Sequence, residues 1–197
     1  SFKFLKEINY NEKMNTTALI SEIIRIYQEK NQENSLKCRT NIQKIAYFVN
    51  NALDLDIKFK PYFYGPYSES IDSSLSFLKE LDLIKEKSEN RNKNTIYEYE
   101  LKETGEEMIK EYAEDSEENF EEIEEKIENI IESVQSKEGF LNPKFLSKAG
   151  KIQLIKKEKE TNDLEEIKEE AEKLDWNLEE LEEDDYSKIN SFLEEVN

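Results

Sequence analysis

Three side-chain types are available for chemistry in this chain: carboxylates, lysines and tyrosines. The 197 residues include no histidine and a single cysteine, Cys38. Without histidine there is no base for Ser-His-Asp or Cys-His catalysis, and one thiol does not build a metal cage. The acids from Glu182 to Asp185 offer oxygen ligands for a divalent cation, but such a cluster on a last helix is more often exposed charge. We therefore expect no enzyme activity, no catalytic residue, no metal site and no cofactor.

The stretch FKPYFYGPYSES, Phe59 to Ser70, contains side chains suited to binding. It holds one of the four glycines, two of the three prolines and a cluster of aromatic residues. Cations interleaved with aromatic rings can hold a peptide or a nucleic-acid strand by stacking and cation–π contacts. The alternative is that lysines on an edge strand block pairing with another sheet while tyrosines cover a helix. The candidate partner-binding residues are Lys58, Lys60, Tyr62, Tyr64 and Tyr67.

A second candidate set combines the helix that follows this stretch with the tip of a later hairpin. Small hydroxyl donors on a helix and basic residues on a hairpin tip can contact a phosphate backbone. Glu69 and Asp72 oppose this interpretation because they would meet phosphates with the wrong sign. The alternative is that these acids complement the helix dipole and that the hairpin tip is a solvated loop. The candidate nucleic-acid-binding residues are Ser68, Ser70, Ser73, Ser74, Ser76, Arg91, Asn92 and Lys93.

The negative charge of the chain is confined to its second half. The net charge is -19, from 28 basic and 47 acidic residues. Residues 1–100 carry 15 of each kind, which leaves 13 basic and 32 acidic residues in 101–197. Phosphate neutralisation supplies most non-specific affinity for nucleic acids, so the acidic half does not favour nucleic-acid binding, whereas the neutral half allows it.

The elements that position the candidate residues follow from the hydrophobic pattern. Apolar periodicity predicts helices over 16–30 and 40–52. The alternation in IKFKPYFYG predicts an edge strand in which Ile57, Phe59, Pro61 and Phe63 face inward, and Gly65 and Pro66 then make a turn. Ser68 caps a helix that runs to about residue 82, and residues 83–101 form a hairpin with a polar tip. This order predicts a mainly α protein with a small β-wing, a winged helix-turn-helix domain over residues 1–114, with 1–14 loosely packed.

An acidic, helical region is predicted over residues 115–197. A capping box of Thr104 and Glu107 opens the preceding helix. A heptad seam then marks an acidic helix that packs on its own chain or pairs with a second copy, and its exposed acids serve solubility or occupy a basic partner. A three-helix subdomain is expected at about 142–197, with helices over 144–158, over 164–174 capped by Asp163, and from about Asn177, and with Trp176 between the last two. The dimer-seam candidates are Phe120, Ile123, Ile127, Ile130 and Val134.

Two segments carry a resemblance to known families. The run from Leu75 to Ile109 resembles the end of bacterial and archaeal winged-helix regulators, with Asp82 in place of their glycine. The piece Asn41 to Ile71 is similar to the YwgA-type family and to the Panacea antitoxin domain. Its matching elements are a "leucine-x-lysine-leucine-x-tyrosine" helix and a "tyrosine-glycine-proline" turn, here Ile42, Lys44, Ile45 and Tyr47, then Tyr64, Gly65 and Pro66. The resemblance covers about half of the chain and implies a non-catalytic regulator or a toxin neutraliser.

Two functions remain open from the sequence. The first is a DNA-binding module like a transcription regulator, dimerised through its C-terminal helices. The second is a protein-interaction module of antitoxin or adaptor type that uses its tyrosine-rich or acidic surface. The partners to be distinguished are thus DNA, another protein and a second copy of the chain. No apolar run is long enough to span a membrane, and a lone cysteine suits a reducing compartment, so we expect a soluble, cytoplasmic protein.

Overall fold

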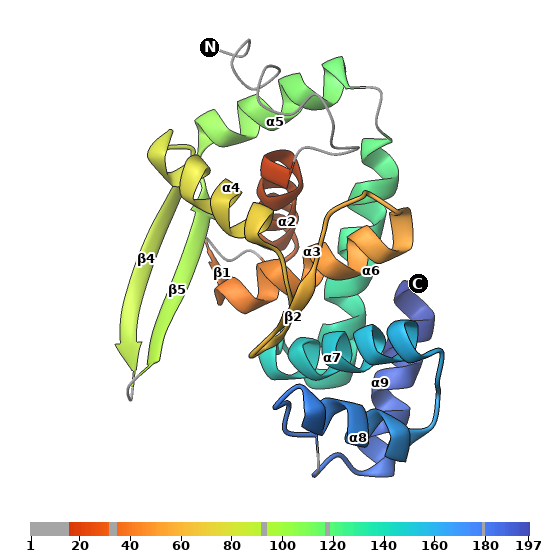
Figure 1. The fold of residues 1–197 in the computed structure, drawn as a ribbon. Coiled ribbons are helices and arrows are strands. Elements are labelled where there is room, and N and C mark those ends of the chain that lie inside the picture. Colours follow the sequence, from red (N-terminus) through yellow and green to blue (C-terminus); the bar gives the residue numbers. More distant parts are fainter. Residues whose placement is uncertain (1–15, 32–34, 92–93, 117–118, 179) are drawn as a thin grey trace.

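The computed structural model describes residues 16–31, 35–91, 94–116, 119–178 and 180–197 (Figure 1). Within these ranges the protein is mainly helical, with eight helices and two small antiparallel sheets. No helix in the same ranges has the length and apolar character needed to cross a bilayer. The helices are α2 (Thr16–Asn31), α3 (Arg39–Leu53), α4 (Glu69–Glu80), α5 (Glu103–Asp115), α6 (Phe120–Glu138), α7 (Pro143–Lys159), α8 (Leu164–Lys173) and α9 (Glu183–Val196). The strands are β1 (Leu36–Lys37), β2 (Lys60–Tyr62), β3 (Gly65–Tyr67), β4 (Ile84–Arg91) and β5 (Asn94–Leu101).

Helix α2 forms the centre of the N-terminal half. It packs against α3, α4, α5 and α6, which surround it in Figure 1. Leu19, Ile20, Ile23 and Ile24 are completely buried, as their helical spacing requires. The predicted helices over 16–30 and 40–52 are confirmed as α2 and α3.

The predicted hairpin over residues 83–101 is also confirmed. Strands β4 and β5 pair antiparallel from Ile84 opposite Leu101 to Arg91 opposite Asn94, and the short β1 adds to the other edge of β5. The hairpin projects from one side of the molecule (Figure 1). Its exposed face carries opposite charges across the strands, such as Lys87 opposite Glu98.

The prediction for the aromatic stretch is wrong about the turn and about two of the four inward residues, whereas Ile57 is buried and Phe59 packs against the core as predicted. Gly65 and Pro66 do not form the turn, because they lie in β3, which pairs with β2 around a turn at Phe63 and Tyr64. Pro61 lies opposite Pro66, a pairing that suits a position without ladder hydrogen bonds because neither residue has an N–H to donate. Phe63, predicted to face inward, is exposed, and so is Pro61.

The predicted capping box at the start of α5 is wrong. The helix begins at Glu103, Lys102 is the N-cap residue, and no side chain caps it. The Lys102 amide donates to the Leu83 carbonyl at 3.0 Å, so the β4–β5 sheet continues directly into the helix, and Thr104 lies inside the first turn and not before it.

The last helix begins at Glu183, later than the predicted start near Asn177. Asp175, with a left-handed φ of 54°, turns the chain after α8. Leu178 and Leu181 then reach the core from a loop. By contrast, Asp163 caps α8 as predicted, since its carboxylate accepts from the amides of Glu165 and Glu166 at 3.0 Å.

The apolar seam of the acidic helix α6 faces the core of its own chain. Because α6 packs against α2, α3 and α9, all five predicted dimer-seam residues are buried, which corrects the proposal that they pair with a second copy. The acids beside the seam are partly neutralised by α2: Arg25 contacts Glu124 at 2.7 Å, and Lys30 contacts Glu128 at 3.1 Å. One hydrophobic cluster runs through both halves of the chain, and the domain boundary at 114/115 stays a prediction. The buried seam residues are Phe120, Ile123, Ile127, Ile130 and Val134.

Candidate functional site

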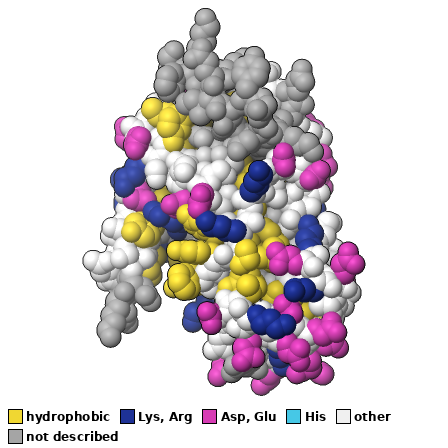
Figure 2. Space-filling view, viewed as in Figure 1, with side chains coloured by type: hydrophobic (Ala, Val, Ile, Leu, Met, Phe, Trp, Pro, Cys, Tyr) yellow, Lys and Arg dark blue, Asp and Glu magenta, His cyan; other side chains and the backbone are white. Residues whose placement is uncertain are grey.

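The turn between β2 and β3 presents three consecutive aromatic side chains to solvent. Tyr62, Phe63 and Tyr64 have exposed fractions of 50%, 73% and 66%. The rings of Tyr62 and Phe63 meet edge to face with centroids 5.0 Å apart, and Tyr62 lies at the same distance from Tyr67. Figure 2 shows hydrophobic side chains gathered near the middle of one face of the molecule, with Lys and Arg around them. We call Tyr62, Phe63 and Tyr64 the aromatic tip.

The backbone of the aromatic tip is held by side chains from distant parts of the chain. The indole N–H of Trp176 donates to the Tyr62 carbonyl at 2.7 Å, and the Ser147 hydroxyl donates to the Tyr64 carbonyl at 2.7 Å. The sequence predicted that Trp176 lies between α8 and the last helix. The structure adds that this side chain ties the β2–β3 hairpin to the C-terminal region.

Two glycines explain why the Tyr-Gly-Pro segment lies so close to α7. Gly65 has a φ of +95°, which glycine adopts without the usual penalty, and a Cβ there would lie 3.2 Å from the Ser147 carbonyl oxygen. On the α7 side, a Cβ at Gly150 would lie 3.1 Å from Pro66 Cδ. Strand β3 therefore packs directly against the backbone of α7, and this fit fixes the position of the aromatic tip.

A buried lysine of α3 completes the attachment. The Lys44 side chain is 2% exposed, and its ammonium donates to the Pro66 carbonyl at 2.5 Å. Burial, with the nearby charge of Lys151 as a smaller cause, lowers the pKa of Lys44 to about 7. The neighbouring Gln43 bonds both the amide and the carbonyl of Ser68 at 3.0 Å, as a strand partner would. Helix α3 thus supports the hairpin and the start of α4 with adjacent side chains.

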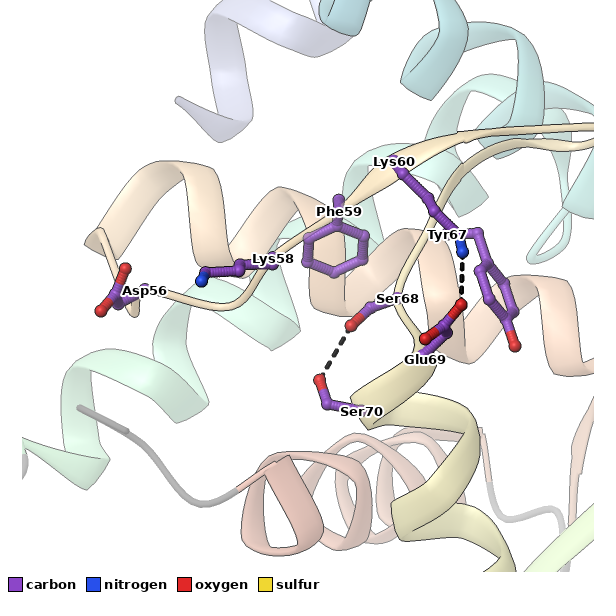
Figure 3. Close-up of a pocket in the computed structure, with 8 residues that line it drawn as sticks. All are labelled: Asp56, Lys58, Phe59, Lys60, Tyr67, Ser68, Glu69 and Ser70. Atoms are coloured by element: carbon purple, nitrogen blue, oxygen red, sulfur yellow. Dashed lines mark hydrogen bonds and ion pairs between the residues drawn. The ribbon is translucent and has the colours of Figure 1, made fainter. Parts of the chain in front are cut away.

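A hollow of about 390 Å³ lies between the approach to β2 and the start of α4 (Figure 3). Its charged lining residues balance, because Asp56 and Glu69 match Lys58 and Lys60, and Lys60 is ion-paired with Glu69. The pairing lowers the pKa of Glu69 through its hydrogen bond to Lys60. A balanced, open hollow of this kind favours neither an anion nor a cation. Its remaining lining residues are Phe59, Tyr67, Ser68 and Ser70.

The structure brings the partner-binding candidates together around the β2–β3 hairpin. Lys58, Lys60, Tyr62 and Tyr64 are exposed, and Tyr67 is half-buried. The sequence pattern predicted that Phe63 faces inward, so the most exposed ring of the group was not among the candidates. The signal that would have identified it is the position of Phe63 two residues before a glycine in a strand-turn-strand segment.

The candidate nucleic-acid-binding residues do not form one exposed surface among the described residues. Ser68 and Ser74 are buried, and Ser74 shares a hydrogen bond of 2.6 Å with Thr16, so these two cannot contact a ligand and their assignment is corrected. Ser70 is half-buried and bonded to Ser68, while Ser73 and Ser76 are exposed. The side chain of Arg91, together with Asn92 and Lys93, lies outside the described residues.

Several acids and bases near α4 are paired with each other. Arg39 contacts both Asp72 at 3.2 Å and Glu86 at 3.3 Å, and it stacks on the Tyr97 ring at 4.7 Å. Lys79 contacts Glu86 at 2.6 Å. These pairs leave no continuous positive stripe along the described part of α4 and the β4–β5 hairpin.

A basic helix close to the aromatic tip was not predicted from the sequence. Helix α7 contains six lysines and one glutamate, although it belongs to the acidic half of the chain. Lys144, Lys148 and Lys151 are spaced i, i+4 and i+7, so they share the helix face that also carries Ser147. This spacing was visible in the sequence, but the proximity of the face to the aromatic tip was not.

The acidic run at the start of α9 remains exposed, and Glu182 is the N-cap residue of that helix. In the ranges that the structure covers, no group of three or more Cys, Asp or Glu side chains is arranged to hold a metal ion. The sequence matches no protein-family model and no curated protein.

Proposed function

We propose that this chain is a non-enzymatic protein-binding module of antitoxin or adaptor type, and that the aromatic tip is its contact surface. The observation that supports this function is a row of three exposed rings on a backbone held by Trp176 and Ser147. Tyrosine and other aromatic residues are enriched at the energetic centres of protein interfaces. Because the hairpin is already ordered, binding loses little conformational entropy, which favours affinity.

The fold we propose is a winged helix with an inserted hairpin. The order α2, β1, α3, α4, β4, β5 and the sheet order β1-β5-β4 support this arrangement. The β2–β3 hairpin then lies between the second and third helices of the winged helix, where a simple turn would suffice. An extra element at this position, with its rings exposed, supports a role in binding rather than in stability. We place the protein in the cytoplasm, which suits the free thiol of Cys38.

Binding of duplex DNA is the second candidate function. It is favoured by the projecting β4–β5 hairpin next to α4, the pair of elements that contacts DNA in winged-helix regulators (Figure 1). It is opposed by the acids at the start of α4 and by the burial of Ser68 and Ser74. We therefore expect weak binding of random duplex DNA in a gel-shift assay at low salt. Salt-sensitive binding that is lost in Lys85→Glu and Lys87→Glu would favour this candidate instead.

Site-specific photocrosslinking tests the protein-binding function. A benzophenone amino acid in place of Phe63 should give a discrete adduct in a lysate of the source organism. The same replacement at Leu81, an exposed apolar residue after α4, is the matched control. No adduct at position 63, or the same adducts at both positions, would contradict the proposal.

A further inference from the structure

The charge of α7 is unusual for this protein. Its six lysines are nearly half of the 13 basic residues in 101–197, where acids outnumber bases by more than two to one. In the described part of the chain, neither Lys144 nor Lys151 has a carboxylate within 4 Å, and Lys148 reaches only Asp185, at 3.8 Å. Lysines with so few ionic partners, in a chain with a net charge of -19, create a local region where an external acid is attracted.

These lysines lie beside the aromatic tip. Ser147, which bonds the Tyr64 carbonyl, is adjacent to Lys148 in the chain and one helical turn from Lys144 and Lys151. A Cβ on Gly65 would lie 3.2 Å from Lys151 Cγ, so Lys151 touches the base of the hairpin, and its ammonium lies 5.5 Å from the centre of the Trp176 ring. The rings and the cations therefore form one surface.

We propose that this surface binds an acidic peptide segment with apolar side chains, whose apolar groups contact the aromatic tip and whose carboxylates contact Lys144 and Lys148. The inference rests on the proposed protein-binding function and specifies the chemistry of the partner. Charge complementarity favours an acidic segment over a basic one. A short peptide is favoured over a nucleic-acid strand because a long polyanion would extend past the lysines onto the acidic surface of the C-terminal half.

The test measures fluorescence anisotropy of the purified chain with defined probes. The first probe is a short fluorescein-labelled peptide that alternates Asp with Leu and Phe. The matched probes replace Asp by Asn, replace Asp by Lys, or replace Leu and Phe by Ser, and a labelled oligothymidine strand represents nucleic acid. We expect the acidic apolar peptide to bind most tightly and its affinity to fall as salt is raised.

Two variants assign the binding to this surface. Lys144→Glu should weaken binding of the acidic peptide about fivefold, because one exposed ion pair is exchanged for a repulsion. The affinity for the Asn peptide should not change. The helix is expected to tolerate this change, since an acid in the first turn complements the helix dipole. Lys110→Glu, the same charge change at an exposed position of α5, is the control. Phe63→Ser should weaken binding of both the acidic peptide and the Asn peptide about tenfold.

Each contrary outcome overturns a stated part of the proposal. Equal binding of the Asp and Asn peptides, both weakened by Phe63→Ser, would overturn the acidic class while the protein-binding function stands. If oligothymidine binds more tightly than any peptide and both variants weaken that binding, the ligand of this surface is a nucleic acid and not a peptide. Binding of no probe would overturn the acidic-peptide inference but not the protein-binding function, because crosslinking from position 63 tests that function separately.

Discussion

Replacement of Lys44 by methionine is predicted to remove a pH dependence of stability that one buried ammonium produces. The structure places Lys44 between α3, β3 and α7, with the Pro66 carbonyl as its hydrogen-bond acceptor and Lys151 as the charged neighbour that lowers its pKa further. Methionine has similar length and no charge, so the packing is kept while proton binding is lost. The carbonyl of Pro66 loses its donor at every pH, which changes the stability by a constant amount.

The size of the effect follows from the two pKa values. Lys44 has a pKa of about 7 in the folded protein and 10.5 as a free side chain. Between these values the unfolded chain binds more protons than the folded chain, so the free energy of unfolding rises with pH. Integrated from pH 7 to pH 9, the contribution of this lysine is about 2 kcal/mol. Above pH 9 the trend is opposed by Tyr47, because burial raises its pKa to about 12 and the unfolded chain then loses protons first.

Urea denaturation at pH 7, 8 and 9 measures this contribution. Trp176 is the only tryptophan and is buried, so its fluorescence reports unfolding. We expect the free energy of unfolding to rise by about 2 kcal/mol less in Lys44→Met than in the unmodified chain over this range. Lys110→Met, at an exposed position, is the control and should not differ from the unmodified chain in slope. Parallel pH dependences for Lys44→Met and the unmodified chain would refute the reasoning.

Three further changes test the attachment of the hairpin and the role of α6. Gly65→Ala should destabilise the fold by about 1–3 kcal/mol in urea denaturation, because the residue has a φ of +95° and a Cβ would lie only 3.2 Å from the Ser147 carbonyl oxygen. Gly139→Ala, which also has a positive φ but lies in open space, should be less harmful. Trp176→Phe should speed amide hydrogen exchange across the β2–β3 hairpin, since the Tyr62 carbonyl loses its donor, and unchanged exchange would argue against this attachment. Ile127→Ala should lower the free energy of unfolding by about 2–5 kcal/mol without changing the mass in light scattering, because the side chain is buried in its own chain. A dimeric unmodified chain and a monomeric Ile127→Ala variant would instead support pairing of two copies through this helix.

The local elements were predictable because their signals are local. Apolar spacing located α2 and α3, and Asp163 marked the start of α8. The turn of the β2–β3 hairpin was not predictable in the same way, because its backbone is held by Ser147 and Trp176, more than eighty residues away in the chain. Pro66 packs against Gly150, and Gly65 lies against Ser147 and Lys151, so the burial of these two residues depends on α7.

The candidate site was predicted in part for the same reason. The sequence identified Lys58, Lys60 and the tyrosines from their composition, and these residues do lie at one hairpin. It did not identify Lys44 as a buried group, since lysine is usually exposed and only the Pro66 carbonyl explains its position. It also assigned Ser68 and Ser74 to a ligand when they bond within the chain.

The hydrogen bonds that hold the hairpin bridge long stretches of sequence, and this has a consequence for synthesis. The partners of Tyr64 and Tyr62 lie 83 and 114 residues further along the chain. A ribosome must therefore make α7 and then Trp176 before the hairpin can dock. Until then the nascent aromatic segment is exposed, which makes it a natural binding site for a chaperone during translation.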